Sequence, residues 1–245
     1  MAGKRNDADK DVIAGDSPPS SRVALSRDRI LDAAIAFIDE QGLPGLTMRR
    51  LGERLDVEAM SLYRYVGGRE ELLDGVVARV IDEMHDDDDV ISVPTDGWQD
   101  FLQRLAHGVR RVALSHPKVF PLVASRPAEA PWLRPPLRSL DWVEMFLNGL
   151  SEEGFDDDKS VGAYRAFTSF LLGHLLLEVA VHGADVGPLD VLDEATEPEQ
   201  DELRPHPNVR KLRSALSEDH SAIEFEESLE ELLNRIAMMS SAKTP

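Results

Sequence analysis

The sequence predicts an all-α protein, and two observations lead to that prediction. Apolar residues recur at the three- and four-residue spacing of amphipathic helices, whereas the alternation typical of half-buried strands reaches no useful length. Short stretches rich in Gly, Pro or Asp separate these segments and predict turns between helices. We expect a three-helix N-terminal domain over 21–70 and a larger helical domain over 71–245.

The N-terminal elements follow in chain order. Residues 1–20 lack periodic apolar positions and end in Ser-Pro-Pro-Ser, which predicts a disordered tail. Ser26 and Thr47 are favourable N-caps for two helices, and Gly42 is a favourable stop for the first of them. The expected helices cover residues 27–41, 48–55, 60–66 and 69–85, the last one leading into the larger domain.

The larger domain is expected to be a bundle of long helices. Residues 159–183 are apolar on more than one face, so this helix must be buried against several others. Six prolines within 117–136 predict short turns and bends, and the acidic, proline-containing segment 184–208 predicts a mobile loop. The remaining expected elements are a solvated loop over 86–97 and helices over 98–114, 137–149 and 221–239.

Composition and charge exclude several classes of protein. The chain has no Cys, and it has no Gly-rich phosphate loop, no nucleophile elbow and no metal-ligand spacing, so we expect neither an enzyme nor a cofactor. No uninterrupted apolar run approaches a membrane span and the N-terminus is unlike a signal peptide, so we expect a cytoplasmic protein with no membrane partner. The formal net charge of -19 disfavours nonspecific DNA binding, but residues 21–70 hold eight Arg and eight acidic residues and are neutral.

Residues 47–65 have the pattern of a helix-turn-helix. Two short helices are joined by a four-residue turn, and Gly52 permits their close approach. The second helix places Leu62 and Val66 inward and presents hydroxyl, phenol and guanidinium groups outward, which suit phosphate and guanine contacts. A solvated helical hairpin without DNA binding fits the same pattern.

The segment "ILDAAIAFIDEQGLPGLTMRRLGERLDVEAMSLYRYVGGREELLDGV" resembles the N-terminal domain of the tetracycline-repressor (TetR) family. "GWQDFLQRLAHGVRRVALSHP" and "SRPAE" further resemble the effector domain of the tetracycline-repressor subgroup, so that the resemblance covers roughly residues 25–180. It implies a homodimeric repressor that binds a palindromic operator with one helix-turn-helix per subunit. A small molecule in the larger domain would change the separation of the two DNA-binding heads.

The resemblance also implies which residues contact DNA. Arg49 matches a position that binds guanine, and Arg69 matches a basic position that binds the DNA backbone. Arg64 replaces an aromatic position and would bind either a base or a phosphate. The expected DNA-contact set is Thr47, Met48, Arg49, Ala59, Met60, Ser61, Tyr63, Arg64, Tyr65 and Arg69.

The expected effector site departs from that of the subgroup. Those proteins bind tetracycline as a magnesium chelate held by a histidine, and the aligned residue here is Leu122 or, with a shift of one, Val123, which cannot bind a hard cation. His85 matches a drug-contacting histidine, although a helix-end histidine stabilised by the helix dipole fits as well. We therefore expect a hydrophobic effector that needs no metal, at a site formed by His85, Leu105, Val109, Leu122, Ser125, Trp142, Met145, Phe146 and Glu178.

Three alternatives stay open at this stage. The chain could be a helical partner-binding module. It could also be a regulator without an effector, in which the residues of the expected effector site simply fill the core. The helices over 159–183 and 221–239 carry more apolar surface than one subunit can cover, which predicts a four-helix dimer interface. Burial within a large monomer is the alternative to that interface.

Overall fold

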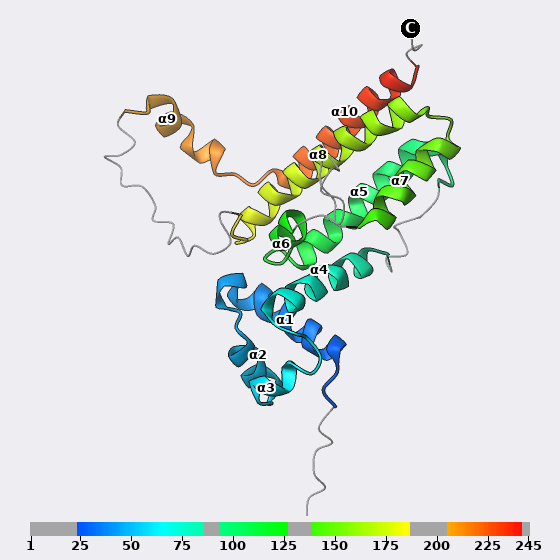
Figure 1. The fold of residues 1–245 in the computed structure, drawn as a ribbon. Helices are drawn as coiled ribbons and strands as arrows, with labels where there is room; N and C mark the ends of the chain where they lie inside the picture. Colours follow the sequence, from blue (N-terminus) through cyan, green and yellow to red (C-terminus); the bar gives the residue numbers. More distant parts are fainter. Residues whose placement is uncertain (1–23, 86–93, 127–138, 187–204, 242–245) are drawn as a thin grey trace, which may run out of the picture.

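A computed structural model describes residues 24–85, 94–126, 139–186 and 205–241, and all regular structure in these ranges is helical. The all-α prediction is therefore confirmed, with an N-terminal helical lobe joined to a larger helical body (Figure 1). Buried side chains from both parts form one continuous hydrophobic core, which extends from Ile30 to Ile236 along the chain.

The N-terminal lobe consists of α1 (Arg27–Gln41), a 3-10 turn (Leu43–Gly45), α2 (Met48–Leu55) and α3 (Ala59–Leu62). The predicted caps are present, because the backbone N–H of Arg29 donates to Ser26 Oγ and that of Arg50 donates to Thr47 Oγ1, both at 3.2 Å. α3 begins one residue earlier than predicted and ends at Leu62, and a turn covers 63–65. Helix α1 packs against both α2 and α4, which holds the lobe together.

Helix α4 (Arg69–His85) connects the lobe to the body. It packs against α1 at one end and against α5 (Gly97–Ser115) and α6 (Phe120–Ser125) in the body. In Figure 1 it crosses the junction between the two parts. Any displacement of α4 therefore acts on both parts at once.

The body is built around α8 (Asp157–Val181), which packs against α5, α6, α7 (Leu140–Glu152) and α10 (Ser221–Ser241). Among the described helices α8 is the one long and apolar enough to cross a membrane by length and composition. A core helix of a soluble protein passes the same test, and the buried face of α8 contacts four neighbouring helices. We therefore assign α8 to the protein core.

Two segments differ from the expectations. Helix α6 lies within the proline-rich stretch expected to form only turns, and Pro121 is accommodated because it stands in the first turn, where no helical N–H is needed. Helix α9 (Pro207–Leu216) was not predicted and begins inside the expected loop 184–208, of which residues 187–204 lie outside the described ranges. All residues of α9 are exposed, and it projects away from the body (Figure 1).

Candidate DNA-binding surface and ligand cavity

The helix-turn-helix geometry depends on a close contact at Gly52. A Cβ at this position would lie 2.9 Å from the carbonyl oxygen of Val57 and 3.2 Å from the backbone N of Ala59. Asp56 makes the turn in the left-handed region at φ 54°, and the N–H of Val57 donates to the Gly52 carbonyl at 3.0 Å. α2 and α3 are thus held at backbone contact, with Leu62 fully buried between them and the rest of the lobe.

None of the ten residues of the DNA-contact set is buried. Thr47, Arg49, Met60 and the 63–65 turn are exposed, and the other four are partly exposed. Met60 is the most exposed large apolar side chain of the set, at 74%. All ten side chains are thus accessible to solvent, on α2, α3, the residues flanking them and the first position of α4.

The arginines of the lobe fall into two groups. Arg54 forms a two-bond pair with Glu40 at 2.6 Å per bond, and Arg50 donates to the Gly45 carbonyl at 2.9 Å and lies over the Phe37 ring. These two side chains brace α2 against α1. Arg49 has only an exposed contact to Glu53 at 3.6 Å, and Arg64 has no ion-pair partner within the described ranges, so both guanidinium groups face solvent.

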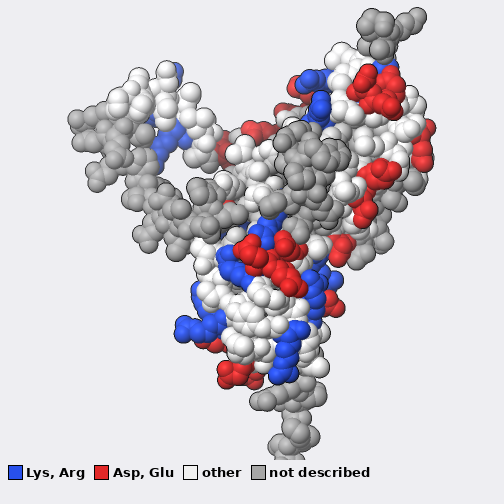
Figure 2. Space-filling model, in the orientation of Figure 1, with Lys and Arg blue, Asp and Glu red and all other residues white. Residues whose placement is uncertain are grey.

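Charge is distributed unevenly over the molecule. Figure 2 shows Lys and Arg side chains on both flanks of the lobe, interspersed with acidic ones, and acidic side chains gathered on the upper body. On the visible face, a polyanion thus meets less repulsion on the lobe than on the upper body, and the projecting α9 shows basic side chains only.

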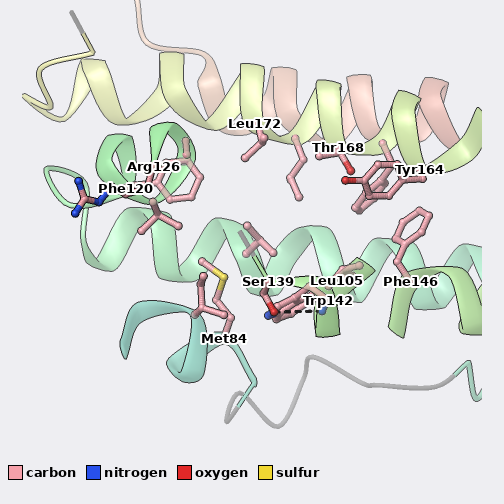
Figure 3. Close-up of a pocket in the computed structure, with 16 residues that line it drawn as sticks. Met84, Leu105, Phe120, Arg126, Ser139, Trp142, Phe146, Tyr164, Thr168 and Leu172 are labelled. Carbon is pink, nitrogen blue, oxygen red and sulfur yellow. Dashed lines mark hydrogen bonds between the residues drawn. The ribbon is translucent and has the colours of Figure 1, made fainter. Parts of the chain in front are cut away.

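A partly open cavity of about 100 Å³ is lined by residues of α4, α5, α6, α7 and α8. Most of its wall is apolar, and four polar residues, Arg126, Ser139, Tyr164 and Thr168, take part in it (Figure 3). The apolar and aromatic lining residues are Ile81, Met84, Leu105, Val109, Phe120, Val123, Ala124, Trp142, Phe146, Phe167, Leu171 and Leu172. Such a wall suits an apolar or aromatic molecule with a few polar groups.

The structure brings four of the nine expected effector residues to the cavity wall, namely Leu105, Val109, Trp142 and Phe146. His85 is exposed and stacks on Trp142 with ring centroids 4.5 Å apart, so it covers the wall without lining it. Val123 lines the cavity in place of Leu122, which is buried in the core. Met145 and the exposed Ser125 do not line it either.

Glu178 does not face the cavity. Its side chain is only 1% exposed and accepts three hydrogen bonds from Arg110, the shortest at 2.5 Å. The expectation of a polar anchor for a ligand is therefore wrong for this residue, which instead joins α8 to α5.

Sequence reasoning missed several lining residues, above all Arg126, Tyr164 and Thr168. The spacing of Tyr164, Thr168, Leu171 and Leu172 along α8 was a usable signal, since these positions share one helix face.

Burial raises the pKa of Tyr164 to about 12, while its hydrogen bond with Thr168 acts in the opposite direction. Tyr164 is consequently a neutral phenol that can donate or accept a hydrogen bond.

His116 joins the body to the N-terminal lobe. It follows the last residue of α5, and its Nδ1 lies 2.7 Å from Asp39 of α1 while its Nε2 lies 3.2 Å from Glu83 of α4. Arg79, paired with Asp32 at 3.1 Å, lines the same surface hollow. The hydrogen bond to Asp39 raises the pKa of His116, and the charges of Asp39 and Glu83 act in the same direction against partial burial.

This bridge predicts a pH-dependent stability. A raised pKa means that the stabilisation is fully present below about pH 6.5 and is lost as the pH rises through the pKa of the folded state. We expect the difference in unfolding free energy between the native chain and His116→Gln to shrink by about 0.5–1 kcal/mol from pH 6 to pH 9. Urea unfolding at both pH values measures it. A difference that stays constant or grows with pH contradicts the bridge.

Within the described ranges, no group of three or more His, Asp or Glu side chains could hold a metal ion.

A helix-turn-helix lobe joined by one long helix to a hollow helical body defines a two-domain regulator fold. The comparisons with known proteins agree with this class. A family model described as "Bacterial regulatory proteins, tetR family" matches residues 30–76, and one described as "Tetracyclin repressor-like, C-terminal domain" matches residues 92–239.

Among the relatives, the tetracycline repressor protein class D of Escherichia coli is 32% identical over 157 residues, which are 62% of this chain and 66% of that protein. The HTH-type transcriptional repressor DrrR1 of Streptomyces coeruleorubidus is 31% identical over 149 residues, 61% of this chain and 52% of that protein. The matched regions thus span about two thirds and about half of these relatives.

A crystal structure of a possible TetR family transcriptional regulator from Streptomyces coelicolor A3(2) superposes with a TM-score of 0.65 at 27% identity, over 87% of this chain and 99% of that one. The chain belongs to the TetR family of bacterial regulatory proteins. This is a family of transcription regulators and not of enzymes.

Proposed function

We propose that the chain is a ligand-responsive transcriptional repressor of the bacterial cytoplasm, which binds a palindromic operator as a homodimer and is released by a hydrophobic small molecule. The observation that carries the proposal is the course of α4. Arg69, at its first position, belongs to the DNA-contact set, while Ile81 and Met84 near its other end line the cavity. One rigid element therefore links the two sites (Figure 1).

The size of the cavity supports a mechanism of release. A volume of about 100 Å³ is smaller than the several hundred Å³ of a typical drug-sized site. An effector of that size fits only if the walls separate, and α4 is one of the walls. Effector binding would thus displace α4 and, with it, the lobe that contacts DNA.

The proposed effector needs no magnesium. The tetracycline repressors among the relatives are named for their drug, but the residues here at the expected metal position are Leu122 and Val123. Neither offers an oxygen or imidazole ligand. A purely partner-binding helical module is the second candidate, and the neutral charge of 21–70 in a chain of net charge -19 favours DNA instead.

Operator binding is tested by selecting preferred duplexes from a random DNA pool at low salt. We expect a palindromic site, and we expect Arg49→Ala to lose discrimination at one base pair per half-site, at about 1–3 kcal/mol for that contact. Tyr63→Phe or Arg69→Ala should weaken binding to all duplexes more evenly. Arg104→Met, on α5 outside the lobe, is the control and should leave DNA binding unchanged. A purified protein without sequence preference would exclude the repressor function.

Homodimerisation is tested by light scattering at micromolar concentration. Helices α8 and α10 lie side by side and leave apolar side chains exposed, among them Leu177 (71%), Val181 (61%) and Ile223 (60%) (Figure 1). We expect twice the subunit mass of 27.2 kDa, and we expect Leu177→Glu with Ile223→Glu to give the monomer. Leu140→Glu, on α7, should leave the dimer intact. A monomeric native protein contradicts this part of the proposal.

A further inference from the structure

The two ring nitrogens of His116 contact two different helices. Nδ1 lies 2.7 Å from Asp39 Oδ2 on α1, and Nε2 lies 3.2 Å from Glu83 Oε2 on α4. Ionised carboxylate oxygens only accept hydrogen bonds, and a neutral imidazole has a single N–H to donate. Both contacts are therefore hydrogen bonds only when the ring carries two protons. In a neutral ring, one nitrogen lone pair faces a carboxylate oxygen instead.

The backbone of His116 is held by the body. Its N–H donates to the Val112 carbonyl of α5 at 3.0 Å. Its carbonyl accepts from the N–H groups of Val119 and Phe120, at 3.1 and 2.9 Å, at the start of α6. Phe120 also lines the cavity. The ring thus projects from the frame of the cavity wall, while one of its two acceptors belongs to the N-terminal lobe.

Most charged groups around the ring are acidic. Those that line the hollow beside it come from α1 and α4, and they are Asp32, Asp39, Arg79 and Glu83. Arg79 is paired with Asp32 at 3.1 Å, and the ammonium group of Lys118 is bound to the Glu40 carbonyl at 3.2 Å. Asp39 Oδ1 is buried and has no hydrogen-bond partner among the described residues. Loss of the imidazolium charge therefore leaves two neighbouring carboxylates that repel each other.

The position of Glu83 connects this bridge to the cavity. Glu83 stands on α4 between Ile81 and Met84, which line the cavity. In the proposed mechanism an effector displaces α4, and this moves Glu83 relative to a ring that α5 and α6 hold in place. The bridge with both contacts therefore belongs to the effector-free arrangement, which is the one that binds the operator.

We propose that His116 is a pH-sensitive bridge that holds the operator-binding arrangement of the lobe. With two protons it ties α1 and α4 to the end of α5, and the loss of one proton loosens this hold and weakens operator binding. The inference rests on the proposed function, since it assigns a regulation to the same repressor. Histidine suits this role because it changes its charge between pH 5 and 8. By linkage, operator binding and proton binding at His116 strengthen each other, and an effector opposes both.

The test measures operator affinity by fluorescence anisotropy at about pH 6 and about pH 8.5, at constant ionic strength. The DNA is the duplex selected from the random pool. Between these pH values the Kd of the native chain should rise about threefold to tenfold more than that of His116→Gln. Glutamine can still donate a hydrogen bond but does not titrate. His220→Gln, which removes an exposed histidine beside Glu218, should keep the native pH dependence.

Glu83→Gln provides a second variant that does not depend on replacing His116. Its amide can donate a hydrogen bond to a neutral ring nitrogen, so the neutral ring is tolerated and the pH dependence should fall by about half. The Glu83 side chain is 49% exposed, and its replacement should therefore leave the fold intact. An NMR titration of the His116 ring measures the coupling directly. The pKa of His116 should be higher with the operator bound than without it.

The outcomes separate this inference from the proposed function. If the native chain, His116→Gln and Glu83→Gln lose operator affinity equally between the two pH values, the inference is overturned while the repressor function stands. A pKa of His116 that is the same with and without operator overturns it as well. If no operator is selected at either pH, the repressor function fails and the inference fails with it.

Discussion

Glu178→Ala is expected to lower the free energy of unfolding by about 3–5 kcal/mol, which is the usual cost of removing one partner of a buried ion pair. Arg110 contacts both carboxylate oxygens of Glu178, at 2.5 and 3.0 Å, and its guanidinium carbon lies 5.1 Å from the centre of the Phe225 ring. The hydrogen bond that Arg110 donates to Glu178 also raises the pKa of Arg110. Without the carboxylate, this charge stays in the junction of α5, α8 and α10 without its hydrogen-bonded partner, and only the charge of Glu226 acts on it in the same direction.

Urea unfolding followed by circular dichroism measures this loss. Asp32→Ala breaks the Arg79–Asp32 pair, whose side chains are 46% and 55% exposed, and it should cost only about 0–1 kcal/mol. The double variant Arg110→Met with Glu178→Met removes both charges and should recover most of the stability. If Glu178→Ala costs no more than Asp32→Ala, the pair does not stabilise this junction.

The position of Glu178 shows where sequence reasoning stops. Helical spacing places Glu178 on nearly the same face of α8 as Leu171, which lines the cavity, so its direction was predictable. Whether Glu178 reaches the cavity or lies beyond its end was not predictable. That depends on where the cavity ends and on where Arg110, on α5, meets α8. A partner 68 positions away leaves no trace in local periodicity.

Elements defined by local signals were predictable. The caps at Ser26 and Thr47, the stop at Gly42 and the inward positions Leu62 and Val66 depend on neighbours within a few residues, and the structure has them as expected. The exposed residues Val209, Leu212 and Leu216 have helical spacing and could have predicted α9. The acidic, proline-containing stretch before them led to a loop prediction instead.

The cavity was predictable only as a set of helix faces. Leu105 and Val109 are four positions apart on α5, and Trp142 and Phe146 are four apart on α7, so each pair lines the wall from one face. Val123 lines the cavity instead of Leu122, which is the alternative that a shift of one residue in the match to the subgroup allowed. Arg126 was missed because its partners, Glu70 and Asp74, precede it by more than fifty positions.

Gly52→Ala is expected to weaken operator binding at least about tenfold, while the cavity still binds its ligand. Alanine in a helix is favoured over glycine by about 1 kcal/mol, so propensity alone predicts a more stable α2. Against this, the new Cβ would meet the Val57 oxygen at 2.9 Å and the Ala59 N and Cα at 3.2 and 3.3 Å. All three are backbone atoms, which cannot rotate away as a side chain does.

Relief of these contacts requires α2 and α3 to separate, and overpacking of this kind costs about 1–3 kcal/mol. The separation displaces Met60 and Tyr63 relative to Arg49, so that the two helices no longer fit one DNA groove together. Gly68→Ala is the matched control, since a Cβ there meets nothing within 4 Å and should leave both stability and DNA affinity unchanged. Fluorescence anisotropy with the selected operator and titration of the cavity with the fluorescent hydrophobic probe N-phenyl-1-naphthylamine follow the two sites separately. If Gly52→Ala binds the operator as tightly as Gly68→Ala does, the spacing of α2 and α3 is not what positions the DNA-contact set.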